Sequence, residues 1–478
     1  MLLIRTTPAE HAVSQFAVLP DPGQAQTLDE VAACLRLLKT WAGNPSYETI
    51  TARVNTRRPP GEQVGKTTVV DCFRAGRRRI DPDLVVAVVE ALHADAGYTN
   101  QWRQALRVAT GETRGAGDQV RVLGSLPGLP VGFVGRTPLI EPAPLTVLSG
   151  MAGAGKTTLA LHVAHRLAAT QRFDRVLAVN LRGSHADQPP AGPEAVLDGF
   201  LRLLGVAGQH LPHGLAAQST AYRNRLSGTR TLVLLDDAAD DSQVRPLTAP
   251  GAGSVTLVTS RRDLGGLTEA DHHTVDVLSP AEAREFLLAA VPPGADPAAA
   301  DRIAETCGYL PLALARVVAH MRERPGWTPA DHADWLAERR RSGRLDPLVR
   351  QALDVSYRNL PGRGRELLRL LAHHPGASFD APAAAALAGA AADEALRDLA
   401  AHHLLVPAGG ARWAMHDLVR VYAAGRSADE DRRSDRRAAL TRLFDHLLTT
   451  GADEADLAAA ADYAAAEGWP FPSRQSAK

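Results

Sequence analysis

The sequence has few lysines and no net charge, and both shortages limit the functions open to it. Only four of the 53 basic residues are lysines, at positions 39, 66, 156 and 478, and the others are arginines. Because arginine and lysine are not equivalent at a binding site, a lysine inside a motif indicates a need for a compact ammonium group. A formal charge of +0 gives no overall attraction to nucleic acid or membrane, so any such role must rest on local charge.

Cysteines and long apolar runs are also scarce. The three cysteines, Cys34, Cys72 and Cys307, are far apart, have no metal-ligand spacing and fit free thiols in a reducing cytosol. We find no secretion signal, and no run of about 18 uncharged apolar residues that would span a membrane. We therefore expect a cytoplasmic protein with no membrane partner.

A glycine-rich segment from Gly150 to Thr158 is the most informative motif. It matches the pattern Gly, four residues, Gly-Lys-Thr, and the apolar run 145–148 precedes it, which predicts a buried strand, a phosphate-binding turn and a helix. Lys156 is expected to reach the β- and γ-phosphates and the Thr157 hydroxyl to ligate Mg²⁺. The predicted phosphate-binding residues are Gly150, Gly153, Ala154, Gly155, Lys156, Thr157 and Thr158. The alternative is a chance match in a glycine-rich chain.

A second Gly-Lys-Thr-Thr occurs at residues 65–68 and serves as a control. Pro60 stands where the first glycine of the motif should be, and no apolar strand precedes it. We predict a helix start there rather than a phosphate site.

The chain length and the hydrophobic pattern predict several domains. The predicted organisation is a flexible tail (1–27), a helical domain (28–110), a linker (111–131), a nucleotide-binding domain (132–278), two further domains (279–345 and 346–425) and a helical or partly disordered tail (426–478). Alternating apolar runs and helical stretches in the nucleotide-binding domain predict an α/β core with a parallel sheet. Its strands are expected at Thr146–Ser149, Val176–Asn180, Thr231–Leu235, Val255–Thr259 and Thr274–Val277.

Two strand ends carry candidate catalytic groups. The run 231–235 ends in Asp236-Asp237, and its carboxyl end is expected beside the phosphate loop. Asp236 would hold the Mg²⁺ shell and Asp237 would orient or deprotonate the attacking water; the alternative is an Asp-rich turn. Arg261 follows the next strand and could report the γ-phosphate, unless it is an ordinary exposed arginine.

The order of these motifs resembles the NB-ARC branch of the STAND signal-transduction ATPases. Matching segments are Phe133–Arg136, the phosphate loop, Val179–Arg182, Leu234–Asp237, Thr259–Arg261, Cys307–Ala313 and Met415–Leu418. The resemblance covers about residues 133–425. It implies a helical domain at 279–341 and a winged-helix domain at 346–425, packed around a bound ATP or ADP.

The same resemblance implies roles for particular residues. Arg136 and Arg261 would contact the nucleotide, Pro311 would pack on the adenine, and His416 would contact the β-phosphate of ADP and lock a closed form. The alternatives are a helix-start proline and a partly buried structural histidine. A slow ATPase acting as a switch, with self-association in the ATP state, is the expected behaviour.

Two departures from the family pattern stand out. Few residues separate Arg136 from Gly150, where family members usually place a helix, so the adenine-side wall is in doubt. Only about fifty residues follow the expected winged helix, so we expect the sensor of many family members to be absent, truncated or on another protein.

Residues 67–82 resemble the second half of a λ-repressor-like helix-turn-helix. Between Arg53 and Arg79 the chain carries eight basic and two acidic residues, a local excess that favours contacts to a phosphate backbone. The DNA-binding candidates are Lys66, Thr67, Thr68, Arg74, Arg77, Arg78 and Arg79. The loop 55–64 is longer than the expected turn, so a five-helix protein-interaction domain with a solvated basic face remains the alternative.

Three functions therefore stay open at this point. The first is a nucleotide switch that binds double-stranded DNA and regulates transcription. The second is a nucleotide-gated oligomerising scaffold whose N-terminal helices bind protein. The third, a metabolic P-loop kinase, lacks any recognisable acceptor site.

Overall fold

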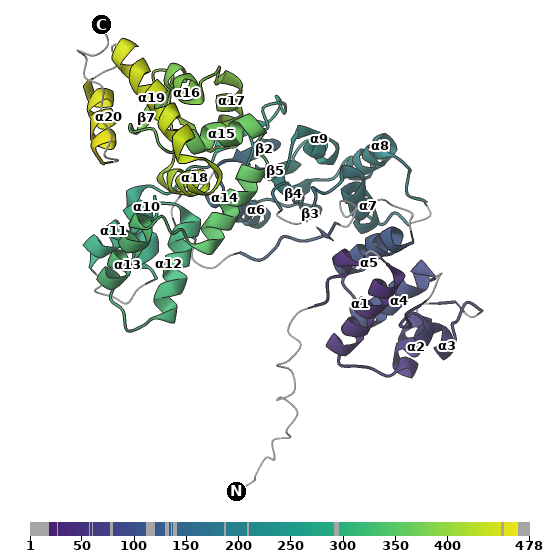
Figure 1. Cartoon of the computed structure of the whole chain (residues 1–478). Coiled ribbons are helices and arrows are strands. Elements are labelled where there is room, and N and C mark those ends of the chain that lie inside the picture. The colour runs from purple at the N-terminus through teal and green to yellow at the C-terminus, as the bar shows by residue number, and fades with distance from the viewer. Residues whose placement is uncertain are drawn as a thin grey trace. The chain divides into compact units, whose positions relative to one another are not determined.

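A computed structural model of the chain (Figure 1) describes most of its residues. The described residues are 19–25, 27–56, 58–59, 61–76, 80–110, 120–129, 133–134, 136, 141–185, 188–207, 210–290, 296–450 and 454–466. The chain divides into two compact units: residues 1–127 with 167–256, and residues 128–166 with 257–478. The flexible tail predicted for 1–27 and the linker predicted for 111–131 lie largely outside the described residues.

The first unit begins with five helices that surround one apolar core. The helical elements are η1 Pro22–Gln24, α1 Leu28–Trp41, α2 Tyr47–Asn55, α3 Lys66–Asp71, α4 Pro82–Leu92 and α5 Ala96–Ala109. Thr27 caps α1 in a reciprocal pair with Glu30, Ser46 caps α2, and Asp81 caps α4, which satisfies the free amides of each first turn. Trp102 is completely buried among these helices. The helical pattern predicted for residues 28–110 is confirmed by these five helices.

The same unit contains three strands and the helices that cover them. These elements are β1 Val122–Leu123, β3 Arg175–Asn180, α7 Pro193–Leu203, α8 Leu215–Leu226, β4 Thr231–Ala238, α9 Asp241–Val244 and η4 Arg245–Leu247. Strand β3 runs parallel to β4, with Arg175 opposite Thr231, and β1 pairs antiparallel with β3 at the edge. Helix α5 contacts both α7 and β1, so the N-terminal helices pack directly on the α/β core.

The second unit contains the glycine-rich segment. Its first elements are β2 Leu145–Ser149, α6 Lys156–Thr170, β5 Val255–Ser260 and β6 Asp271–Thr274. Strand β2 is buried along its whole length and runs parallel to β6. The six strands take the order β1-β3-β4-β5-β2-β6. The chain thus has the mostly parallel sheet of a P-loop core, as predicted.

Helices dominate the rest of the second unit, where one large apolar cluster runs through them. The first group is α10 Pro280–Leu288, α11 Pro297–Thr306, α12 Pro311–Glu323 and α13 Pro329–Arg341. The second group is α14 Pro347–Arg358, α15 Gly362–Leu371, β7 Ser378–Asp380, α16 Ala381–Ala388, α17 Asp393–Ala401, β8 Val406–Pro407, β9 Arg412–Ala414 and α18 Asp417–Glu430. Its antiparallel sheet has the order β7-β9-β8. We refer to residues 346–425, where a winged helix was expected, as the winged-helix region. Helices α19 Arg433–Thr450 and α20 Glu454–Ala466 follow.

Two local expectations were wrong. The last core strand was expected at Thr274–Val277, but β6 is Asp271–Thr274. Its polar residues join the sheet through main-chain pairing with β2 rather than as a buried apolar run. The expected linker contains strand β1, which is too short for a periodic pattern.

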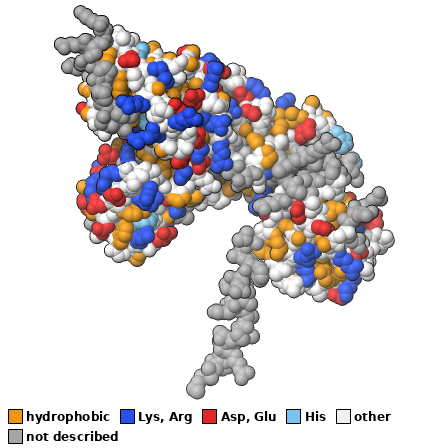
Figure 2. Space-filling view, in the orientation of Figure 1, with side chains coloured by type: hydrophobic (Ala, Val, Ile, Leu, Met, Phe, Trp, Pro, Cys, Tyr) orange, Lys and Arg blue, Asp and Glu red, His pale blue; other side chains and the backbone are white. Residues whose placement is uncertain are grey.

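The visible surface mixes both signs of charge (Figure 2), in line with the zero net charge. No helix within the described ranges is long and apolar enough to cross a bilayer. The described residues also contain no group of three or more His, Cys, Asp or Glu side chains placed to hold a metal ion.

Candidate nucleotide-binding site

The glycine-rich segment forms a tight loop between β2 and α6. Its three glycines all have positive φ, at 149° for Gly150, 83° for Gly153 and 88° for Gly155. Only glycine adopts such angles without strain, and the loop thereby turns its amides toward the start of α6. The helix begins at Lys156, where its unpaired amides form an anion-binding end.

Two of these glycines also leave no room for a side chain. A Cβ at Gly150 would lie 2.4 Å from the carbonyl oxygen of Val275, and one at Gly153 would lie 2.9 Å from the Cβ of Leu312. The loop is therefore held against the chain that follows β6 and against α12. A main-chain cradle this close-fitting suits a phosphate group.

Lys156 lies within the loop and is only 8% exposed. Its ammonium donates to the carbonyl oxygens of Gly150 and Met151 at 2.8 and 2.9 Å. The charge is thus held at the loop, where a phosphate can accept a charge-assisted hydrogen bond.

Helix α12 starts directly against the loop. Pro311 is its first residue, and a Cβ at Gly155 would lie 3.8 Å from the proline ring. The backbone N–H of Leu312 donates to the carbonyl oxygen of Gly153 at 3.2 Å. The structure therefore brings Pro311 to the phosphate loop, and its predicted contact with adenine stays a prediction.

His416 joins the winged helix to the end of α11. Its Nδ1 accepts from the N–H of Leu418 at 3.1 Å, so Nε2 carries the proton and donates to the carbonyl oxygen of Gly308 at 2.9 Å. Gly308 has φ of 57°, and a Cβ there would lie 2.5 Å from the Cε1 atom of His416. Burial lowers the pKa of His416 more than its bond to Gly308 raises it, which favours the neutral ring.

Arg136 is bound to the main chain around the loop. Its guanidinium donates to the carbonyl oxygens of Ala154 and Asp276 at 2.6 and 2.7 Å, and its own N–H donates to Glu282. Burial lowers the pKa of its guanidinium. In this structure Arg136 therefore links the phosphate loop, at Ala154, to the segment that follows β6, at Asp276.

Arg261 follows β5 and faces the winged-helix side. Its guanidinium donates to the carbonyl oxygen of Ala352 in α14 at 2.8 Å. Two residues later, the N–H of Asp263 donates to the carbonyl oxygen of Ala401 at the end of α17. The strand end is therefore in contact with α14 and with the end of α17. The predicted contact of Arg261 with the γ-phosphate stays a prediction.

A comparison with known protein families decides what this site is. The model of the NB-ARC domain matches residues 139–296, which include the phosphate loop and both strand-end motifs. The chain carries an NB-ARC domain. For residues 139–296 this match supports the resemblance to the NB-ARC branch of the STAND ATPases that the motifs indicated, and with it a nucleotide-binding site.

Two curated relatives extend the similarity beyond the NB-ARC domain. Regulatory protein AfsR of Streptomyces coelicolor is 32% identical over 92% of this chain and 45% of its own length. The protein of the same name from Streptomyces griseus is 38% identical over 64% of this chain and 32% of its own length. The chain thus spans less than half the length of either relative.

A solved STAND protein with a tetratricopeptide repeat sensor, PH0952 from Pyrococcus horikoshii, also matches. It shares 16% identity over 71% of this chain and 49% of its own length, with a TM-score of 0.31. A similarity this low adds no argument about the NB-ARC site.

The acidic pair of the NB-ARC domain lies at the end of β4, in the first unit. Asp236 accepts from the side-chain amide of Asn180 at 3.1 Å. Asp237 has φ of 57° and accepts from the N–H and the hydroxyl of Ser184. The carboxylates are thus held by the last residue of β3 and by the segment that follows it. Their predicted approach to Mg²⁺ and to water stays a prediction.

Sequence reasoning foresaw no contact for three residues that shape the NB-ARC site, although Gly308 lies in the matching segment Cys307–Ala313. Gly308 accepts from His416, Glu282 holds the backbone of Arg136, and Ser184 fixes Asp237. The sequence pointed only to Gly308, because it stands three residues before Pro311. Nothing in the sequence pointed to Glu282 or Ser184, whose hydrogen-bond partners lie far away along the chain.

The DNA-binding candidates lie on and after α3. Lys66 forms an ion pair with Glu48 of α2, Thr67 and Thr68 are exposed, and Arg74 pairs with Asp71 at 3.2 Å. Arg77, Arg78 and Arg79 lie outside the described residues. The long loop between α2 and α3 is closed by Asn55, whose side chain makes two hydrogen bonds to the backbone of Val64 at 2.9 and 3.0 Å.

Proposed function

We propose that the chain is an ATP/ADP-dependent switch that regulates transcription. The observation that carries the proposal is the bond from His416 to Gly308, three residues before Pro311 at the phosphate loop. Through it the winged helix is tied to the wall of the nucleotide site. A change of nucleotide at the loop can therefore alter how the winged helix is held.

The residues present fit a nucleoside polyphosphate. The cradle at Gly150 and Gly153 excludes side chains, and the ammonium of Lys156 is held within it. Lys156 would bind the β- and γ-phosphates, while Thr157 and Asp236 would hold Mg²⁺, which takes few protein ligands when phosphates supply the rest. When bound, Mg²⁺ would neutralise charge on the phosphates.

The switch works through a difference in affinity. If ADP binds the locked arrangement better than ATP does, exchange shifts the population toward an open form, and only that difference can drive the change. Asp237, whose carboxylate is held by hydrogen bonds from Ser184, would orient the attacking water. We expect ATP turnover by such a switch to be slow.

His416→Ala tests the lock. The substitution removes both hydrogen bonds of the ring, to Gly308 and from Leu418, so we expect ADP to dissociate about tenfold faster. His213→Ala, at an exposed position, is the matched control and should match the parent. Stopped-flow release of a fluorescent ADP analogue measures the rate. An unchanged rate in His416→Ala would rule out the lock.

Asp236→Ala tests the magnesium assignment. The variant loses the carboxylate that accepts from Asn180, so Mg²⁺-dependent ATP hydrolysis should fall to background. Circular dichroism checks that the fold survives. Unaltered turnover would show that Asp236 has no part in the site.

DNA is the proposed target of the N-terminal helices. The support is the local excess of basic residues together with the curated relatives, which are named regulatory proteins. The exposed pair Thr67 and Thr68 lies at the start of α3, where side chains of a recognition helix contact base edges.

A second candidate is a nucleotide-gated scaffold that self-associates in the ATP state. It is favoured by the ion pairs of Lys66 with Glu48 and Arg74 with Asp71, which would occupy these cations on a solvated protein face. Light scattering and duplex binding, each with ATP and with ADP, separate the two. Duplex binding with a steep salt dependence supports the first, and ATP-driven oligomers without duplex binding support the second.

A further inference from the structure

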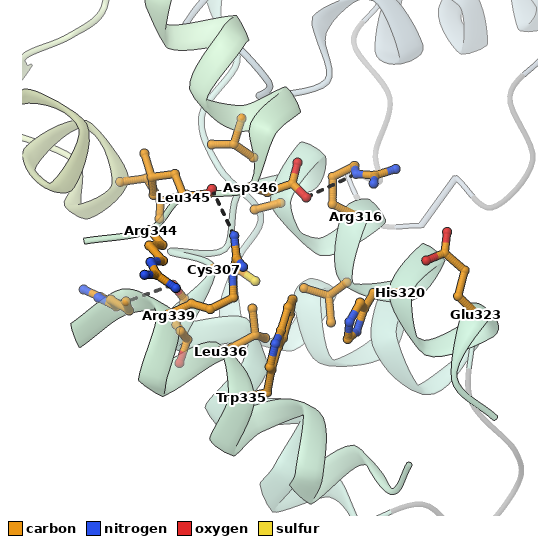
Figure 3. Close-up of a pocket in the computed structure, with 16 residues that line it drawn as sticks. Cys307, Arg316, His320, Glu323, Trp335, Leu336, Arg339, Arg344, Leu345 and Asp346 are labelled. Carbon is orange, nitrogen blue, oxygen red and sulfur yellow. Dashed lines mark hydrogen bonds and ion pairs between the residues drawn. The ribbon is translucent and has the colours of Figure 1, made fainter. Parts of the chain in front are cut away.

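A cavity distinct from the phosphate loop opens between the two helical groups of the second unit. It has a volume of about 110 Å³ and is lined by α12, α13, α14 and the start of α18. Figure 3 shows its walls, with the rings of Trp335 and His320 face to face. These rings stack with their centroids 4.0 Å apart and an interplanar angle of 11°.

The interior of the cavity is apolar. Val317, Leu336 and Val349 contribute aliphatic walls, and Leu418 contributes one from the winged helix. Cys307 is 3% exposed, and burial raises the pKa of its thiol to about 12, so it acts as a neutral apolar surface. A somewhat larger apolar cavity, of about 150 Å³, accepts a benzene ring. This one is therefore of the size for one small ring or a short branched chain.

The rim of the cavity is positively charged. Four arginines line it against two carboxylates: Arg316, Arg339, Arg340 and Arg344, with Glu323 and Asp346. Arg316 is paired with Asp346 at 3.4 Å, and Arg340 is paired with Asp417 at 2.6 Å.

Unlike Arg316 and Arg340, the side chains of Arg339 and Arg344 form no ion pair among the described residues. Arg339 lies over the ring of Trp335 with its guanidinium carbon 5.1 Å from the centroid, and it donates to a main-chain carbonyl at 3.4 Å. Arg344 is exposed, and among the described residues its side chain makes no hydrogen bond or ion pair. A guanidinium in such a position binds a planar carboxylate.

The cavity is built from the neighbours of the His416 lock. Cys307 precedes Gly308, whose carbonyl accepts from His416, and Leu418 supplies the N–H that His416 accepts. Arg340 of α13 is bound both to Asp417 and to the main chain at the end of α11. A molecule in the cavity would therefore contact both sides of the lock at once.

We propose that this cavity binds a small molecule with one flat apolar body and one carboxylate, and that binding stabilises the locked arrangement. The apolar body enters between Val317, Leu336 and Trp335, and the carboxylate meets Arg339 and Arg344 at the rim. Because both helical groups form the walls, the ligand binds the arrangement seen here better than one in which they separate. The regulatory half of this inference rests on the proposed nucleotide switch.

Benzoate is the probe for the site, with benzyl alcohol as its neutral counterpart. Ligand-observed NMR and chemical-shift changes on the full chain measure binding. We expect benzoate to bind at least about tenfold more tightly than benzyl alcohol. The double change Arg339→Gln with Arg344→Gln should weaken benzoate about tenfold, and Arg350→Gln, on an exposed arginine outside the cavity, should have no effect.

Val317→Phe is a second variant, which fills the cavity without touching the rim and should abolish benzoate binding. Equal binding by the parent, the double variant and Val317→Phe would overturn the site. A chemical-shift map that leaves the Trp335 indole unchanged would do so as well.

The release rate of ADP tests the regulatory half. Saturating benzoate should slow ADP release by about threefold or more in the parent, and it should have no effect on the double variant. Benzoate binding without slower release would overturn regulation while leaving the site. A protein that binds benzoate but no nucleotide would instead contradict the proposed function.

Discussion

The tetrapeptide Gly-Lys-Thr-Thr occurs twice in this chain, and its two copies have different structures. Both start a helix at the lysine, α3 at Lys66 and α6 at Lys156. The preceding glycine has φ of 88° at position 155, but −77° at position 65. Lys66 is 55% exposed and pairs with Glu48, whereas Lys156 is 8% exposed and donates to main-chain carbonyls.

The difference between the copies lies in what precedes them. A buried strand and two more positive-φ glycines, Gly150 and Gly153, come before the second copy. The first copy follows an irregular loop that is closed by Asn55. The comparison teaches that the strand and the glycines build the phosphate cradle, while the shared tetrapeptide by itself only starts a helix.

Removing the lysine from each copy gives the largest expected contrast. Lys156→Ala should weaken nucleotide binding more than about 1,000-fold, about 4 kcal/mol, because the cradle loses its ammonium. Lys66→Ala should bind nucleotide like the parent. Calorimetry with ADP and Mg²⁺ measures both. Heat of binding retained by Lys156→Ala, or lost by Lys66→Ala, would reverse the assignment of the two copies.

Acid should weaken the unit that holds the second copy. His374 is 3% exposed, and burial lowers its pKa from 6.5 to about 4. The unfolded chain therefore takes up a proton below pH 6.5, while the folded chain does so only near pH 4. Stability falls over this window by about 3 kcal/mol.

Hydrogen exchange at pH 7 and at pH 4 locates this acid effect. After correction for the slower intrinsic exchange at pH 4, lower protection factors are expected around residues 374–380, and the protection of helices α1–α5 should change less. His374→Asn keeps an acceptor for the N–H of Gly376, which lies 3.0 Å from the ring, but it cannot titrate. A pH dependence as steep in this variant as in the parent would show that His374 is not the source.

Replacing a glycine by alanine should destabilise the two copies by different amounts, and this difference should be smaller than the effects above. Gly153→Ala places a Cβ 2.9 Å from Leu312 at a φ of 83°, which should cost about 2 kcal/mol. At Gly65 the nearest atom is 4.0 Å away, so the change there should cost about 0.5 kcal/mol as a weakened cap. Thermal unfolding measures the difference. Equal shifts would mean that the loop at Gly153 is not held against α12.

The smallest expected effect belongs to the first copy. If Lys66 leaves Glu48 to contact a DNA phosphate, Lys66→Ala should reduce the salt slope of duplex binding by about 0.9. Lys39→Ala, on α1, should leave the slope unchanged. Fluorescence anisotropy over a series of salt concentrations measures it. An unaltered slope for Lys66→Ala would favour a protein-binding face over a DNA-binding one.

Much of the fold could be read from local pattern. The helix start at Lys156 and four of the five core strands were predicted correctly, because a glycine turn and an apolar run are local signals. The strand β6 was placed wrongly, since its polar residues belong to the sheet only through main-chain pairing with β2. Strand β1 was missed because a strand of two residues is too short to show an alternation of apolar and polar side chains.

The candidate site was predictable as a set of motifs and not as a set of contacts. Pro311 was expected near the nucleotide, and the structure brings it to Gly155. The partner of His416 was not predictable, because Gly308 lies 108 residues earlier. The carbonyl that accepts from Arg261 belongs to α14, and no pattern in either segment indicates that bond.

The order of residues alone determined that the chain carries a P-loop core, because a strand, a glycine turn and a helix are encoded within fourteen consecutive positions, 145–158. The tertiary structure decided which lysine is buried, which glycines admit no side chain and which carbonyl His416 holds. Those outcomes depend on how distant helices pack against the loop, and packing between distant segments leaves no periodic signal in the sequence.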